Sequence, residues 1–243
     1  MMGDINPNRV FERTQTKGDA MRISVANKKA VFFGSMGVLV ETSDLQRQAY
    51  NLAFEWAGID LSWNIGTYCH LLKRSGGLLR LRRCLGHKIP EERLIEIHKR
   101  KERIFCEMLS SSLRPRPGVK ELIDCCKTGG KKIGWITATS EANLSAIGSA
   151  IRPHVDINDF DIITSGADAE RPKPFADVYE FALKRTSSDA LDVLAIEDTQ
   201  VCLKSATSAN IETLFFPNEF SHCKPKLTDY VVHDLRKGII ELS

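Results

Sequence analysis

Five short apolar runs are spaced along the chain and predict the strands of one sheet. They lie at 30–34, 131–137, 161–166, 191–198 and 212–216. Segments with apolar residues at spacings of three and four follow them and predict helices. Alternation of apolar strands with helices is typical of an α/β fold, in which helices cover both faces of a mostly parallel sheet.

The helices are marked by their periodicity and by residues at their ends. One is predicted to follow the first strand, where apolar residues recur with helical spacing at Leu45, Ala49, Leu52, Ala53 and Trp56. Others are predicted after Pro90, after Gly118, after Ser140, over 177–185 and around 200–209. We expect Ser140 to cap its helix, and Asn210 to end the 200–209 helix in the left-handed conformation.

The spacing of the strands predicts how the chain is divided. No strand is predicted between about 60 and 113, which indicates a helical insertion over the sheet. We therefore expect a core of residues 29–44 and 114–243, with a helical cap of residues 45–113. Residues 1–28 are polar and without periodicity, so we expect a flexible extension, and Met21 is an alternative start.

Composition narrows the class of protein. The 243 residues are 42% hydrophobic and 27% charged, which is typical of a globular protein. A net charge of +3 gives no reason to expect a nucleic-acid partner, and no apolar run is long enough to span a membrane. The N-terminus is not a secretory signal, and the seven cysteines include no CxxC pair. We expect a protein of the reducing cytoplasm.

The residues that end the predicted strands are the candidate site, because ligands of such sheets bind at the carboxyl ends of the strands. These positions are 34–37, 137–140, 166 and 197–199. They include a hydroxyl at Thr137 and an acidic pair at Glu197 and Asp198. No cysteine is expected at a strand end that faces this site.

Four stretches of sequence resemble, in order, the motifs of haloacid-dehalogenase-like (HAD) hydrolases of subfamily I, near the CbbY and β-phosphoglucomutase branch. They are FFGSMGVLVETSD (32–44), IGWITAT (133–139), RPKPFADVY (171–179) and LAIEDTQVCLKSATSANI (194–211). The resemblance covers residues 30–216 and implies a Rossmann-like core with an inserted helical cap. It also implies a phosphatase or phosphomutase that acts on a phosphorylated small molecule.

Two positions of the first motif depart from that family. The resemblance implies an aspartate nucleophile and, two residues later, an acid/base aspartate, which share one side of the strand end. Gly34 and Met36 occupy these positions and can neither attack phosphorus nor carry a proton. Neither Ser35, Glu41 nor a cysteine is well placed to substitute for the nucleophile.

The remaining site residues are better preserved. The resemblance implies phosphate binding by Thr137, Lys173 and the backbone at Ala138. It implies a Mg²⁺ site formed by Glu197, Asp198 and the backbone carbonyl of Met36, which the missing carboxylate at position 34 weakens or abolishes.

The predicted cap also retains part of the family pattern. In the stretch RSGGLLRL (74–81), Arg74 and Arg80 are candidate contacts to a substrate anion, or residues of a solvated helix face. Gln46 stands where the family often has a histidine. His70, His87 and His98 lack metal-binding spacing and are expected to be solvated or packing residues.

Three hypotheses of function follow from the sequence. The first is a protein that binds a phosphorylated small molecule with little or no phosphatase activity. The second is a hydrolase that uses a non-standard nucleophile or substrate assistance, and the third is a scaffold for interactions with other proteins. Fold alone does not choose between them, because function depends on the site.

Overall fold

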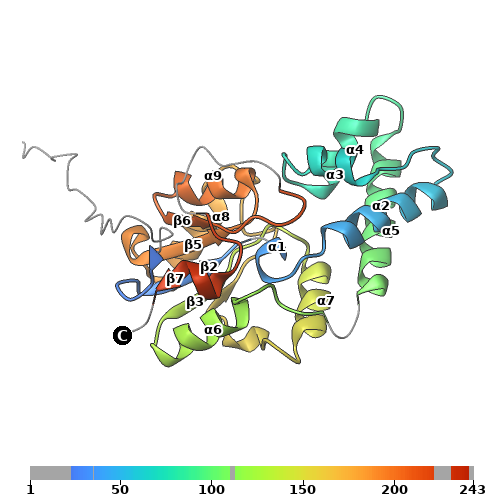
Figure 1. Cartoon of the computed structure of the whole chain (residues 1–243). Helices are drawn as coiled ribbons and strands as arrows, with labels where there is room; N and C mark the ends of the chain where they lie inside the picture. The colour runs from blue at the N-terminus through green and yellow to red at the C-terminus, as the bar shows by residue number, and fades with distance from the viewer. Residues whose placement is uncertain (1–22, 35, 110–112, 222–230, 241–243) are drawn as a thin grey trace, which may run out of the picture.

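A computed structural model describes residues 23–34, 36–109, 113–221 and 231–240. A five-stranded parallel sheet in the order β4-β3-β2-β5-β6 forms the core (Figure 1). Each predicted strand is present, although shorter than its apolar run. The bounds are β2 Ala30–Phe33, β3 Lys132–Trp135, β4 Ile162–Ile163, β5 Val193–Glu197 and β6 Glu212–Phe215.

Alternation along β2 divides the core into two layers. Val31 and Phe33 pack in one hydrophobic cluster with residues of α6 (Val119–Thr128) and α7 (Glu141–Ile151). Ala30 and Phe32 point to the opposite face, where they pack with residues of α8 (Asp177–Thr186) and α9 (Gln200–Ser208). Because successive strand residues face opposite sides, this sheet is covered on both faces, and the predicted α/β fold is confirmed.

The structure also confirms two predicted helix ends. The Ser140 side chain accepts a hydrogen bond from the backbone N–H of Asn143 and caps α7. Asn210 has φ 58°, in the left-handed region, two residues before β6 begins. Two short 3₁₀ helices, Ile157–Asp159 and Ala190–Asp192, lead toward β4 and β5.

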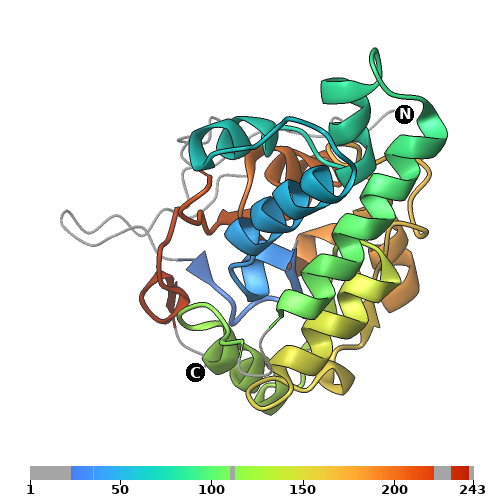
Figure 2. The same ribbon diagram turned by 90° about the vertical axis from the view of Figure 1, so that its right-hand side faces the viewer.

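Helices α2 to α5 form the cap. They are α2 Ser43–Trp56, α3 Ile65–Leu71, α4 Gly77–Leu85 and α5 Glu91–Met108. Helices α2 and α5 run side by side in both views (Figures 1 and 2). An aromatic cluster of Tyr50, Phe54, Trp63 and Tyr68 joins α2 to α3, with ring centroids 4.8–6.2 Å apart. In the described part of the chain, no helix is both long and apolar enough to cross a membrane.

The face that α2 buries agrees only in part with the predicted one. Ala49 and Ala53 are buried as the pattern predicts, whereas Leu52 and Trp56 are 43% and 48% exposed. The apolar pattern was therefore misleading at these last two positions. Trp56 is covered in part by two arginines of α5, Arg93 and Arg100, whose guanidinium carbons lie 4.9 and 5.9 Å from its ring centroid.

The chain passes between core and cap twice, and Arg116 holds both passages. After β2, the short helix α1 (Met36–Leu39) leads to α2. The backbone N–H of Arg116, on the returning segment, donates to Leu39 O at 2.9 Å. Its guanidinium donates to the carbonyl oxygens of Gly37, Phe216 and Pro217 at 2.6–2.9 Å. This arginine ties the two passages to the end of β6.

Both ends of the described chain add to the core. Strand β1 (Ile23–Ser24) pairs in parallel with β7 (Ile239–Ile240), which follows α10 (Leu235–Gly238). Val25 is fully buried. The expectation of a flexible extension over 1–28 is therefore wrong for residues 23–28, and residues 1–22 lie outside the described residues. Sequence periodicity missed these strands because two residues are too few to show alternation.

Candidate functional site

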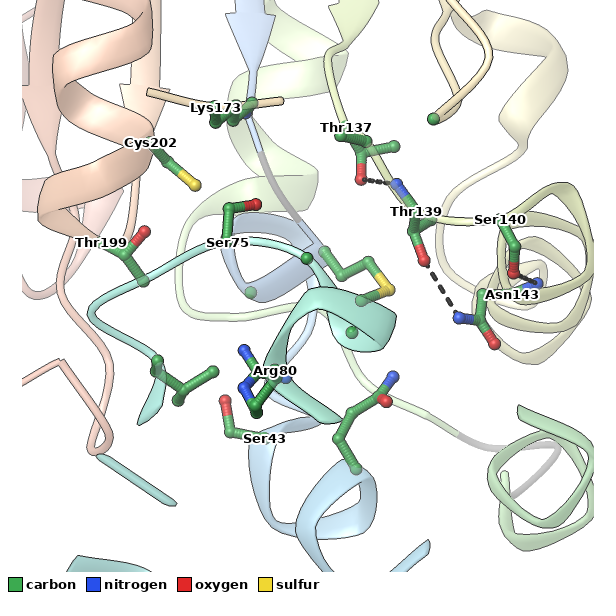
Figure 3. A pocket seen from close by; sticks show the side chains of 18 of the residues that line it. Ser43, Ser75, Arg80, Thr137, Thr139, Ser140, Asn143, Lys173, Thr199 and Cys202 are labelled. Atoms are coloured by element: carbon green, nitrogen blue, oxygen red, sulfur yellow. Dashed lines mark hydrogen bonds between the residues drawn. The ribbon is translucent and has the colours of Figure 1, made fainter. Parts of the chain in front are cut away.

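A cavity of about 500 Å³ lies between the carboxyl ends of the strands and the cap. Its core wall includes Thr137, Lys173 and Asp198, and its cap wall includes Arg80 and Lys101. Figure 3 shows that side chains from the core and from the cap face a common space. The structure thus brings Thr137, Lys173 and Asp198 to one cavity with both predicted cap arginines, and the cavity has a size typical of a small-molecule site.

A buried ion pair lies at the floor of the site. Lys173 Nζ donates to Glu197 Oε1 at 2.6 Å and to Ile136 O at 3.1 Å. Tyr179, on α8, also donates its hydroxyl to Glu197 Oε1 at 2.6 Å. Burial alone would lower the pKa of Lys173, but the neighbouring carboxylate of Glu197 raises it overall. Lys173 is therefore a cation at neutral pH, and it stabilises the buried carboxylate.

The space beside Gly34 is filled by Glu197. A Cβ atom on Gly34 would lie 2.1 Å from Cδ of Glu197 and 2.3 Å from Oε2. The backbone N–H of Gly34 donates to Ile196 O at 2.8 Å, which fixes the end of β2 beside β5. Met36 begins α1, and its carbonyl oxygen accepts from Val40 N–H at 3.0 Å. That helical bond directs the carbonyl along α1.

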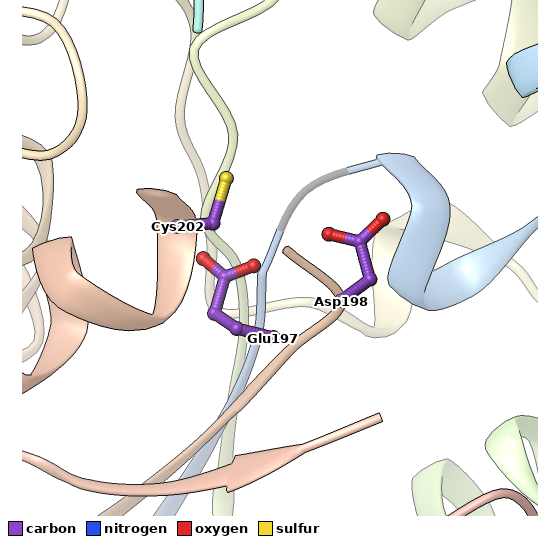
Figure 4. A group of neighbouring side chains, drawn as sticks. All are labelled: Glu197, Asp198 and Cys202. Carbon is purple, nitrogen blue, oxygen red and sulfur yellow. The ribbon is translucent and has the colours of Figure 1, made fainter. Parts of the chain in front are cut away.

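Glu197, Asp198 and Cys202 form a buried cluster with potential metal ligands. One donor atom of each lies within 4.8 Å of those of the other two (Figure 4). Asp198 Oδ2 accepts from Asn218 Nδ2 at 3.1 Å. The sequence predicted no cysteine at a strand end facing this site, but Cys202 reaches the cavity from α9. Its place in the first turn of α9, which starts at the end of β5, is the sequence signal that could have found it.

These donors fit Mg²⁺ poorly. Mg²⁺ requires near-octahedral oxygen ligands, but position 34 contributes no carboxylate. The third side chain of the cluster carries sulfur, a donor that Mg²⁺ does not favour.

The loop after β3 presents hydroxyl and amide groups to the cavity. Thr137 is 3% exposed, and its Oγ1 accepts from the backbone N–H of Thr139 at 3.3 Å. Because that bond uses the oxygen as an acceptor, the hydroxyl hydrogen can be donated to a ligand. The backbone N–H of Thr137 donates to Thr164 Oγ1 instead. Ala138 lines the cavity next to it, as the phosphate-binding prediction requires.

Two buried cations of the cap face the core. Arg80 is 8% exposed and donates to Tyr50 Oη at 3.5 Å and to Arg74 O at 3.4 Å. Lys101 is 4% exposed and donates to Gln46 Oε1. Within the described residues neither forms an ion pair, and Nε of Arg80 has no hydrogen-bond partner. Burial, together with the charge of Arg80, lowers the pKa of Lys101 to about 7.

The other predicted cap residues are less enclosed. Arg74 lines the cavity but is exposed, so it differs from Arg80 in its surroundings. His98 also lines the cavity and is half-buried, with Nδ1 3.7 Å from Oε2 of Glu102. Burial lowers the pKa of His98. Lys101 was missed from the sequence because it interrupts the apolar face of α5, where a lysine is usually assigned to the solvent side.

Comparisons with known proteins agree with this architecture. A model of the haloacid dehalogenase-like hydrolase family matches residues 37–216. Protein CbbY of Rhodobacter capsulatus is 34% identical over 199 residues, covering 79% of this chain and 87% of that protein. A phosphorylated carbohydrates phosphatase of Thermotoga maritima is 28% identical over 188 residues, covering 77% of this chain and 84% of that protein.

Solved structures show the same similarity. CbbY from Rhodobacter sphaeroides in complex with phosphate has a TM-score of 0.80 and 28% identity, covering 88% of this chain and 97% of that one. A mutant of the same protein, with the same TM-score, identity and coverage, was solved in complex with xylulose-(1,5)-bisphosphate. The likeness extends over both the sheet and the cap.

Proposed function

Because this chain belongs to the haloacid dehalogenase-like hydrolase family, we propose that it binds a phosphorylated small molecule between core and cap without hydrolysing it by the aspartyl-phosphate route. The observation that carries the proposal is at position 34. Glycine there has no nucleophile, and the carboxylate of Glu197 fills the space in which a side chain would begin. Glu197 is itself held by Lys173 and Tyr179.

Groups that recognise phosphate are retained around that position. Lys173 is a buried cation, and the Thr137 hydroxyl and the backbone at Ala138 line the same wall of the cavity. Hydroxyl, amide and ammonium donors are the usual partners of phosphate oxygens. The core wall therefore supports binding of one phosphate group without transfer of that group to the protein.

The cap supports a second anionic contact. Arg80 and the protonated form of Lys101 are buried cations without an ion pair in the described residues, and such groups are costly unless something neutralises them. A bound anion would do so. The similar CbbY structure holds a bisphosphate, which supports a ligand with anionic groups at both ends.

Two measurements on the purified chain test the proposal. The first is phosphate release from a panel of sugar phosphates and p-nitrophenyl phosphate with Mg²⁺. The second is calorimetric binding of sugar monophosphates and bisphosphates. We expect binding without release, and at least tenfold weaker binding for Arg80→Ala. Arg83→Ala, an exposed arginine on the same helix, is the matched control and should bind like the wild type.

A restored variant tests the missing chemistry directly. Gly34→Asp and Met36→Asp return both carboxylates, and Glu197→Asp shortens the side chain that occupies the space. We expect the triple variant to release phosphate where the wild type does not. If the wild type releases phosphate and Asp198→Asn abolishes that release, the chain is instead a hydrolase with a non-standard mechanism. No binding by either protein would favour a scaffold.

A further inference from the structure

The cluster of Glu197, Asp198 and Cys202 combines hard and soft donors in one buried place. The three residues are 0%, 4% and 7% exposed, and their donor atoms lie within 4.8 Å of one another. Two carboxylates and a thiolate are a donor set that Zn²⁺ and Co²⁺ accept and that Mg²⁺ and Ca²⁺ do not favour. We propose that this cluster binds a thiophilic divalent cation, with Zn²⁺ or Co²⁺ as the ion and Cys202 as the sulfur ligand.

Two glycines pack directly against the carboxylates of the cluster. A Cβ atom on Gly34 would lie 2.1 Å from the Glu197 carboxylate carbon, and one on Gly37 would lie 2.0 Å from Oδ2 of Asp198. Any larger residue at either position would displace a carboxylate. Glycine at both positions therefore allows the two carboxylates to keep the places from which they can bind an ion.

The charges of the cluster balance when an ion is bound. On binding, the thiol of Cys202 releases its proton to solvent and its sulfur bonds the metal. The three ligands then carry three negative charges, which a divalent cation and the ammonium of Lys173, 2.6 Å from Glu197, neutralise together. A neutral assembly avoids the large penalty of an unpaired buried charge.

The geometry requires only a small adjustment. Tetrahedral sites with bonds of about 2.0 to 2.3 Å place neighbouring ligands roughly 3.5 Å apart. Donor atoms that are at most 4.8 Å apart therefore need to approach by about an ångström. Asp198 and Cys202 line the cavity, so the fourth coordination position opens toward it and can hold a water molecule or an anionic group.

Titration of the reduced, metal-free chain with Co²⁺, in a buffer without phosphate, tests this proposal. We expect a near-ultraviolet thiolate-to-cobalt charge-transfer band that Zn²⁺ removes by displacement and a tenfold excess of Mg²⁺ does not. Cys202→Ser should lose the band and bind Zn²⁺ at least tenfold more weakly. Cys125→Ser, at a thiol outside the cluster, should keep both properties.

A band that persists in Cys202→Ser, or its absence from the wild type, would overturn the proposal. If Cys202→Ser does not fold, X-ray absorption of the Zn²⁺-loaded wild type decides. One sulfur neighbour at about 2.3 Å supports the site, and a shell without sulfur excludes it. Because no phosphorylated compound is present, failure here leaves the proposed binding of a phosphorylated molecule untouched.

Discussion

Lys101 is expected to destabilise the folded chain, and removing its charge should reverse that effect. Burial, and then repulsion from Arg80, lowers its pKa from 10.5 to about 7. At about 1.4 kcal/mol per pKa unit, this difference corresponds to a penalty of about 5 kcal/mol for the charged form in the folded state. Lys101→Met removes the charge and keeps an apolar chain beside Tyr50 and Phe105.

The gain in stability from Lys101→Met is reduced because the substitution also removes a hydrogen bond. Gln46 Oε1 accepts from Lys101, and without that donor a buried acceptor costs roughly 1 to 3 kcal/mol. We therefore expect Lys101→Met to raise the free energy of unfolding by about 2 to 4 kcal/mol at pH 6.

The effect has a defined dependence on pH. The folded pKa lies below the unfolded one, so between about pH 7 and pH 10.5 the unfolded chain binds more protons than the folded chain. The destabilising effect of Lys101 therefore decreases as pH rises through this window, and the free energy of unfolding of the wild type increases. The advantage of Lys101→Met should shrink over the same range and vanish or change sign near pH 10.

Urea unfolding at pH 6, 8 and 10 measures this difference. Lys99→Met, at an exposed lysine of the same helix, controls for the general effect of the substitution and should change stability little. An equal effect of Lys101→Met at pH 6 and pH 10, or a loss of stability at pH 6, would refute the reasoning.

Three further outcomes are expected. The affinity of the cavity for sulfate, an anion whose charge is constant near neutral pH, should fall as pH rises through about 7, because Lys101 then loses its proton. Equal affinities by calorimetry at pH 6 and pH 8 would contradict this. Lys173→Met should destabilise the chain by about 3 to 5 kcal/mol in urea unfolding, because Glu197 is left buried without its cation, whereas exposed Lys184→Met should not. Gly34→Ala should lower the free energy of unfolding by about 1 to 3 kcal/mol, because the new methyl group overpacks against Glu197. Gly66→Ala, whose new methyl group would have no atom nearer than 3.5 Å, should lower it far less, and equal effects would show that Glu197 moves freely.

Local signals predicted much of the core. Strand positions followed from short apolar runs, since a strand buried on both faces has no polar side to obscure it. The cap at Ser140 and the left-handed turn at Asn210 depend on a single residue's backbone chemistry and were confirmed. The strand formed by residues 23–24 was missed because its partner is more than 200 residues away in the sequence.

The site was predicted less completely, because its details depend on contacts between distant elements. Leu52 and Trp56 fit an apolar stripe, but α2 packs against α5 with a face that is shifted from this stripe and includes Gln46. The enclosure of Lys101 likewise arises only where α5 meets α2. Cys202 enters the site through the angle at which α9 leaves β5, and no spacing rule for metal ligands describes that arrangement.

The position of the Glu197 carboxylate bears on how this chain can evolve. A mutation that introduces aspartate at position 34 would meet that carboxylate, which is anchored by Lys173 and Tyr179. The mutation is therefore expected to be unfavourable until Glu197 has shifted or shortened. Gain of a carboxylate at position 34 thus depends on the order of mutations, because a change at position 197 that comes first makes the second change tolerable.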